Sequence, residues 1–225
     1  MEIETINRLQ SSPLGAEGHP VTIIKYNAGN IQSVLYALER IGVSAIVTDD
    51  HEQIIAADKI IFPGVGEARS AMNYLNERGL DKVIKNLTQP VLGICLGMQL
   101  MCRYSEENDT PCLSIFGEEV KKFASPHPPE SSSGQALKGG IKIPQIGWNN
   151  IYDLKSPLFK NVPEESYCYF VHGYYAALGE HTIATTNYVQ PYSSALHRGN
   201  FYGVQFHPEK SAVVGEQILK NFISL

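Results

Sequence analysis

The sequence predicts a single α/β domain, in which a central and mostly parallel sheet is flanked by helices and continued by an antiparallel extension. Three observations lead to this fold class. Buried-strand runs alternate with helical runs between residues 21 and 103, which favours parallel strands joined by crossover helices. Short strands separated by Gly and Pro turns follow from Val120 to Phe206. The 225 residues are 43% hydrophobic, which suits one domain with a substantial core.

The elements follow in order from residue 21, so residues 21–225 are expected to form the domain. Residues 1–20 show no apolar periodicity and are expected to be a flexible N-terminal tail. A strand at 21–24 is followed by a helix over 31–41, in which apolar residues recur at helical spacing. Further strands are expected at 44–48, 59–62, 91–94, 167–172, 182–186, 193–197 and 201–206, helices at 68–78, 96–103 and 211–222, and a mobile Pro/Ser/Gly-rich loop at 125–140.

Composition excludes several classes of function. The net charge is −5 and no Lys/Arg block stands out, so binding to nucleic acid or to an anionic membrane surface is not expected. No apolar run approaches the roughly 20 residues that span a bilayer. The four cysteines, at unrelated spacings, form neither a zinc pattern nor a disulfide framework. We therefore expect a cytoplasmic protein with no metal and no cofactor.

The pentapeptide Gly93-Ile94-Cys95-Leu96-Gly97 is typical of a nucleophile at a strand-to-helix turn. Flanking glycines permit a tight turn because they remove side chains that would clash. At the start of a helix, backbone N–H groups favour a thiolate, and the Leu96 N–H is placed to hold an oxyanion. The alternative is a buried Cys between two packing glycines. Gln99 lies one helical turn after Cys95, where it either contacts a polar substrate or is a partly exposed helical Gln.

His207 is the candidate base, because it ends an expected strand in Gln205-Phe206-His207-Pro208-Glu209. Residues i and i+2 of an extended chain project to similar sides, so Glu209 can orient one ring nitrogen while the other faces Cys95. A packed strand-end histidine is the alternative. His172 is a weaker rival base for which a structural role is favoured, and His181 stands in loop sequence and is expected to be solvated.

A second glycine loop, Pro63-Gly64-Val65-Gly66, follows the third expected strand. The carboxyl ends of parallel strands line the ligand crevice, so this loop should border the same cleft as Cys95. Its backbone can offer an N–H to a tetrahedral intermediate, and Gly64 lowers the cost of reorienting the peptide. It matches no phosphate-binding fingerprint. An ordinary βα turn is the alternative.

PGVG, GICLGMQ and a distant HPE occur here in the order that is characteristic of class I (triad-type) glutamine amidotransferases, and residues 21–225 closely resemble that flavodoxin-like family. Within it, the chain is most similar to the glutaminase subunit of imidazole glycerol phosphate synthase. The features that narrow the resemblance are Gly29-Asn30, PGVG, Pro144–Asn149, Phe170–Tyr175 and His207–Ser211.

The resemblance implies a chemistry. Cys95 would attack the side-chain amide of glutamine, with His207 moving protons and Glu209 orienting it. The N–H groups of Leu96 and Val65 would hold the oxyanion, the latter after the Gly64–Val65 peptide flips. Gly64, Gly66 and Gln99 would form the glutamine site.

The resemblance also implies a partner. Ammonia would pass to a (βα)8-barrel cyclase subunit that makes imidazole glycerol phosphate in histidine biosynthesis, in a heterodimer. The docking face would include Asn30, Trp148, Asn149 and Lys210.

Other functions remain open at this point. The chain could serve another synthase, in surface-sugar amidination or in anthranilate, guanylate or pyridoxal phosphate synthesis. A catalytically silent binding subunit is a second alternative, and the intact Cys95, His207 and Glu209 argue against it. A cysteine peptidase or a redox-sensing thiol protein of similar fold is a third.

Overall fold

The computed structural model describes residues 21–27, 30–124 and 142–225. The expected tail over 1–20 and the whole of the expected loop over 125–140 lie outside the described residues. Among the residues that are described, no helix is both long and apolar enough to cross a membrane.

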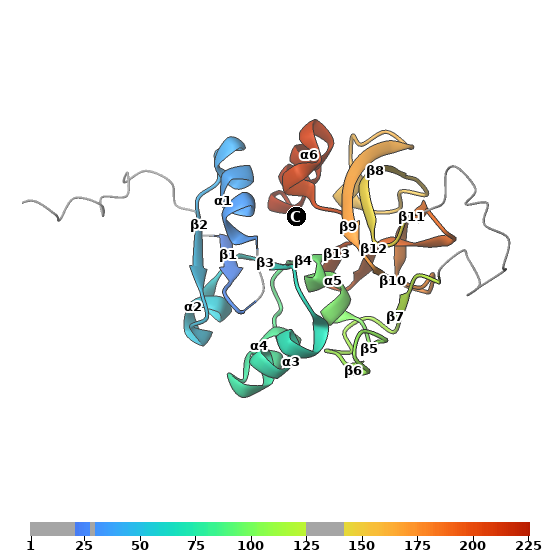
Figure 1. Cartoon of the computed structure of the whole chain (residues 1–225). Helices are drawn as coiled ribbons and strands as arrows, with labels where there is room; N and C mark the ends of the chain where they lie inside the picture. The colour runs from blue at the N-terminus through green and yellow to red at the C-terminus, as the bar shows by residue number, and fades with distance from the viewer. Residues whose placement is uncertain (1–20, 28–29, 125–141) are drawn as a thin grey trace, which may run out of the picture.

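The strands fall into a long mixed sheet and a separate pair (Figure 1). They are β1 (Val21–Ile24), β2 (Ala45–Thr48), β3 (Lys59–Gly64), β4 (Val91–Cys95), β5 (Tyr104–Ser105), β6 (Thr110–Pro111), β7 (Glu119–Lys122), β8 (Gln145–Ile151), β9 (Ser166–His172), β10 (Tyr174–Ala176), β11 (Thr182–Asn187), β12 (Pro191–Arg198) and β13 (Phe201–Val204).

The long sheet runs in the order β2-β1-β3-β4-β13-β12-β10-β7-β5-β6, and β11 pairs with β12. The five strands from β2 to β13 are parallel, whereas β12 pairs antiparallel with β13, β11 and β10. β8 and β9 form an antiparallel sheet of their own. The predicted α/β class, with a parallel centre and an antiparallel extension, is confirmed.

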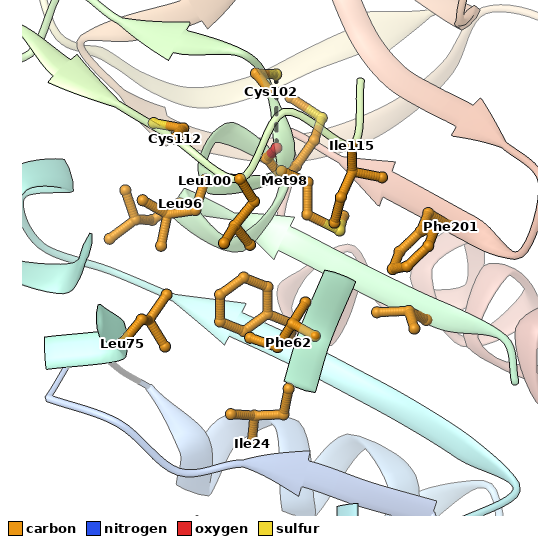
Figure 2. Packing of buried hydrophobic residues seen from close by; sticks show 14 of the residues in the cluster. Ile24, Phe62, Leu75, Leu96, Met98, Leu100, Cys102, Cys112, Ile115 and Phe201 are labelled. Carbon is orange, nitrogen blue, oxygen red and sulfur yellow. Dashed lines mark hydrogen bonds between the residues drawn. The ribbon is translucent and has the colours of Figure 1, made fainter. Parts of the chain in front are cut away.

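Helices cover both faces of the parallel strands and bury two apolar clusters. They are α1 (Ile31–Arg40), α2 (His51–Ala56), α3 (Ala68–Glu77), α4 (Leu80–Lys85), α5 (Leu96–Met101) and α6 (Ala212–Ile223), with 3-10 turns η1 (Pro157–Phe159) and η2 (Pro208–Lys210). On one face, α3, α4 and α5 contribute to an apolar cluster that includes Phe62. Figure 2 shows Phe62 with Leu75 of α3 and Leu96 and Leu100 of α5. On the other, α1 and α6 pack against Ile23 and Ile94. Successive residues of a strand therefore point to opposite faces of the sheet and pack in different clusters.

Most predicted elements are present, but several boundaries differ. The helix expected over 96–103 ends at Met101, because Cys102 is extended and the Arg103 N–H pairs with the Glu118 carbonyl. The strand expected over 201–206 ends at Val204 and leads into η2. The short helices α2 and α4 are additions to the predicted set, since each has only 6 residues and shows little periodicity.

The sheet register brings three strand ends to one edge. Gly64 at the end of β3 is level with Cys95 at the end of β4, and Val204 of β13 is level with Ile94. β13 comes from the far end of the sequence, yet it pairs directly with β4. The loops after these three strands therefore meet where parallel sheets bind their ligands.

Candidate active site

Cys95 lies at the strand-to-helix junction that the sequence predicts, as the last residue of β4. Its backbone angles, φ 53° and ψ −108°, are rarely adopted by a residue with a side chain. The neighbouring glycines explain how the turn fits. A Cβ on Gly97 would overlap the Phe62 carbonyl, and one on Gly93 would lie 2.8 Å from the Met98 nitrogen. The motif thus allows α5 to pack directly on β3 and β4.

His207 and Glu209 form a buried pair beside this turn. His207 Nδ1 is 2.8 Å from Glu209 Oε1, and both side chains are at most 3% exposed. Burial acts to lower the pKa of His207, but hydrogen bonds and charge interactions with Cys95 and Glu209 outweigh it and raise the pKa from 6.5 to about 10. The structure therefore brings Cys95, His207 and Glu209 together, and the protonated form of His207 is favoured by the neighbouring Cys95 and Glu209.

Backbone contacts fix the position of His207. Its N–H donates to the Tyr169 carbonyl at 2.9 Å, and its own carbonyl accepts from the Ser211 hydroxyl at 2.7 Å. Ser211 Oγ in turn accepts from the Tyr169 N–H at 3.0 Å. Pro208 begins the η2 turn directly after His207. These contacts tie the HPE segment to β9, so the imidazole has little freedom to leave Cys95.

A cavity of about 210 Å³ opens over Cys95. Seven of the residues predicted from sequence line it, namely Val65, Gly66, Cys95, Leu96, Gln99, His207 and Lys210. Glu209 and Gly64 are not among its lining residues: Glu209 stands behind His207, and Gly64 is buried in β3. Asn30, Trp148 and Asn149 do not line it either.

Gln99 is buried and its amide nitrogen is fully used within the protein. Nε2 donates to the Tyr174 carbonyl and to Gln205 Oε1, each at 2.9 Å. An amide NH₂ has two hydrogens, so only Oε1 remains to meet a ligand, as an acceptor. The alternative of a partly exposed helical Gln is wrong, because Gln99 is only 5% exposed.

Glu107 is a lining residue that sequence reasoning missed. Its Oε2 accepts from the Ala68 N–H at 2.8 Å. Burial raises the pKa of Glu107, with a further rise from Glu67, while the Ala68 hydrogen bond opposes both. In the sequence it stands within Glu106-Glu107-Asn108-Asp109, which is typical of a solvated acidic loop. Only tertiary folding brings this carboxylate to the cavity.

The rival histidines are held by internal partners. His172 Nδ1 is 2.7 Å from the Tyr174 carbonyl and Nε2 is 3.3 Å from the Tyr192 hydroxyl. Burial lowers the pKa of His172 to about 4, against that hydrogen bond, so the ring is neutral and engaged on both sides. This supports a structural role. The expectation that His181 is solvated is wrong, because Nδ1 lies 2.9 Å from the buried Glu118.

An exposed apolar surface lies next to the cavity, on the outer face of the β8–β9 sheet. Ile146 and Trp148 are 64% and 54% exposed, and cross-strand pairing sets Ile146 opposite Val171 and Trp148 opposite Tyr169. We call Ile146, Trp148, Tyr167, Tyr169 and Val171 the β8–β9 outer face. Because Val171 also lines the cavity, this face and the cavity are continuous.

Two of the residues expected at a docking face have local roles. Asn149 follows Trp148 and is paired with the buried Cys168, so its side chain is on the opposite side of β8 from the outer face. There it donates to the Asn187 carbonyl at 3.0 Å. Asn30 precedes α1, and its Oδ1 accepts from the Ser33 hydroxyl at 2.7 Å.

The fold and this site together define a class of protein. A family model described as "Glutamine amidotransferase class-I" matches residues 22–225. The chain belongs to the class I glutamine amidotransferase family. A solved crystal structure of a glutamine amidotransferase from Thermotoga maritima shares the fold, with a TM-score of 0.57 at 16% identity over 93% of this chain and 84% of that chain.

Relatives within the family are more similar. An imidazole glycerol phosphate synthase subunit HisH of Bacteroides fragilis (strain YCH46) is 56% identical over 205 residues, which is 91% of this chain and 99% of the relative. The subunit of the same name from Haemophilus influenzae is 44% identical over 204 residues, 90% of this chain and 96% of the relative. The similarity therefore extends over nearly the whole of this chain and of each relative.

Proposed function

We propose that the protein is the glutaminase subunit of an imidazole glycerol phosphate synthase, which hydrolyses glutamine and delivers ammonia for histidine biosynthesis. The observation that carries this proposal is the buried Cys95–His207–Glu209 arrangement at the floor of a small cavity. The relatives that share the subunit name favour this function over the other glutaminases weighed from the sequence.

The reaction proceeds in two halves at Cys95. The thiolate attacks the amide carbon of glutamine, and His207, as an imidazolium, gives its proton to the nitrogen as the C–N bond breaks. Ammonia leaves and a glutamyl thioester remains. His207 then takes a proton from water, whose oxygen attacks the thioester and displaces the thiolate. Glutamate departs, and Glu209 keeps the imidazole oriented throughout.

The oxyanion of each tetrahedral intermediate needs backbone donors. Leu96 is the first residue of α5, where an N–H has no partner within the helix, and it lines the cavity. Val65 lines the same cavity. We propose that its N–H becomes available when the Gly64–Val65 peptide rotates. The adjacent Pro63 carbonyl is held by the buried Tyr26 hydroxyl at 2.7 Å, which confines the movement to the peptide beyond it.

The α-ammonium group of glutamine requires negative or acceptor groups. Glu107 supplies a carboxylate in the cavity wall, and Gln99 has only Oε1 to offer. Gly66 lines the cavity with φ +120°, a conformation that favours glycine, and its lack of a side chain lets the backbone approach a ligand. These three residues form the proposed recognition set.

Ammonia must be shielded from water, because only the unprotonated form is a nucleophile. We propose that a (βα)8-barrel cyclase subunit covers the cavity by docking on the β8–β9 outer face, with Trp148 as an aromatic anchor and Lys210 at the cavity rim. Asn30 lies between β1 and α1, after the carboxyl end of a strand of the long sheet, and it contributes to the docking face there. Asn149 acts indirectly, by holding β8 against Asn187. A cytoplasmic location is part of this proposal.

The test is to purify the chain with a barrel cyclase and to compare wild type with Cys95→Ala. Cys95→Ala should abolish glutamine-dependent synthesis yet leave ammonia-driven synthesis unchanged, because the acceptor chemistry lies in the partner. Cys168→Ala, which alters a buried thiol outside the cavity, is the matched control. Equal loss of both activities in Cys95→Ala would contradict the division of labour, and failure to form a complex would contradict the proposed partner.

A further inference from the structure

A chain of two buried side-chain amides, Gln99 and Gln205, reaches the sulfur of Cys95 from within the protein. Gln205 follows β13 and is completely buried. Its Oε1 accepts from Gln99 Nε2 at 2.9 Å, and its Nε2 donates to Cys95 Sγ at 3.6 Å. Gln205 does not line the cavity, so it is not part of the proposed recognition set.

The direction of each amide follows from one backbone group. The Tyr174 carbonyl can only accept, so Gln99 must turn its NH₂ toward it. The second hydrogen of that NH₂ points to Gln205, which must therefore present its oxygen. The NH₂ of Gln205 is then left facing Cys95. No other orientation of the two amides satisfies all three contacts.

We propose that Gln205 is a positioning residue that acts through Cys95: its amide N–H holds the sulfur in place and stabilises the thiolate that attacks glutamine. This inference rests on the proposed role of Cys95 as the nucleophile. An N–H donor aimed at sulfur favours the charged form over the neutral thiol. Because Gln205 is fully buried, water cannot replace the donor once it is removed.

Other titratable groups face the sulfur and must be kept separate from the effect of Gln205. His207 hydrogen-bonds to Cys95 and is the proposed proton carrier. The phenols of Tyr26 and Tyr192 also interact electrostatically with Cys95. Burial raises the pKa of both phenols, so neither changes charge between about pH 5 and 9. His172, Glu107 and Lys210 also line the cavity, but they are the same in wild type and in a Gln205 variant, so a difference in alkylation rate between the two proteins reports on Gln205.

The experiment measures how fast iodoacetamide alkylates Cys95 in the full chain, followed by peptide mapping from about pH 5 to 9. Gln205→Met removes the donor at similar length, and we expect the rate at pH 7 to fall about tenfold. Gln205→Glu keeps the shape and replaces the donor with a carboxylate, which should slow the reaction further. The matched control is Gln217→Met on α6, whose amide bonds Asn221, and it should react like wild type.

The outcomes separate this inference from the proposed function. Circular dichroism establishes which variants are folded. If Gln205→Met is not folded, the alkylation rate of Gln205→Glu tests the inference. Wild-type alkylation rates in a folded Gln205 variant would overturn the inference, because an amide that only fills space can alter stability without altering the sulfur. A different measurement tests the proposed function: it fails if the wild-type complex does not hydrolyse glutamine.

Discussion

Gly97 marks the place where α5 packs most tightly on the central sheet, and its replacement by Ala gives a sharp prediction. A Cβ built there would lie 2.9 Å from the Phe62 carbonyl carbon and closer still to its oxygen. Carbon atoms in ordinary contact are about 3.5–4.0 Å apart. The obstacle is the backbone of β3, a central strand that cannot swing aside as a flexible side chain would. Gly97→Ala therefore forces α5 away from β3 by more than about 1 Å.

Two opposing effects set the size of the result. Overpacking against an unyielding neighbour costs about 3 kcal/mol of unfolding free energy. Ala favours a helix over Gly by up to about 1 kcal/mol, which offsets part of that cost. The net loss is about 2 kcal/mol, and for a chain of this size it corresponds to a decrease in melting temperature of about 4–8 °C. Steric overlap is the larger effect.

The assay is thermal unfolding followed by circular dichroism, with Gly117→Ala as the matched control. A Cβ on Gly117 would meet only His181 Cε1, at 3.8 Å, so this variant should melt within about 2 °C of wild type. The shift of α5 also displaces Cys95, and glutamine hydrolysis by the complex should fall about 100-fold while the protein is still folded. A Gly97→Ala variant with wild-type melting and wild-type activity would refute the packing argument.

Three further predictions concern the triad and the docking face. His207→Ala should reduce glutamine hydrolysis more than Glu209→Gln, because the latter keeps a partner that can orient the ring; the reverse order in steady-state rates would mean that the roles are wrongly assigned. Although burial lowers it, the pKa of His207 is raised from 6.5 to about 10 through Cys95 and Glu209. Protonated His207 therefore stabilises the folded state fully below about pH 6.5, and this stabilisation is lost as the pH rises through about 10. The free energy of unfolding in urea should differ less between pH 6 and pH 10 for His207→Gln than for wild type. Trp148→Ala should weaken binding of the barrel partner about 30-fold or more in a titration, without changing the melting temperature of the isolated chain; unchanged affinity would exclude the β8–β9 outer face.

The parallel half of the fold could be predicted because each strand there is a continuous apolar run and α1 and α3 are long enough to show a period. α2 and α4 have 6 residues each, and their signals are local rather than periodic. Asp50 caps α2 by accepting from the Gln53 N–H, and Gly79 precedes α4 in the left-handed conformation. Such caps can be recognised in a sequence, but they are also common in turns.

The predicted site shows the same division between local and long-range information. The turn at Cys95 and the spacing of His207 and Glu209 are encoded within five residues each, and the structure has the expected local geometry. Glu107 and Gln205 carry no such signal. Glu107 lies in an acidic loop, and its place in the cavity wall depends on its contact with Ala68, 39 residues away. The contact between Gln205 and Cys95 spans 110 residues, so only the paired strands β4 and β13 create it.

The sheet order has a consequence for how the protein is made. β13 occupies a central position beside β4, yet it is among the last strands to be synthesised. Synthesis proceeds from the N-terminus, so a nascent chain that already contains Cys95 still lacks β13 and the proposed base, His207. Until β13 pairs with β4, His207 cannot lie beside Cys95. Under the proposed function, the glutaminase site is therefore completed late in synthesis, when β13 takes its place between β4 and β12 in the middle of the sheet.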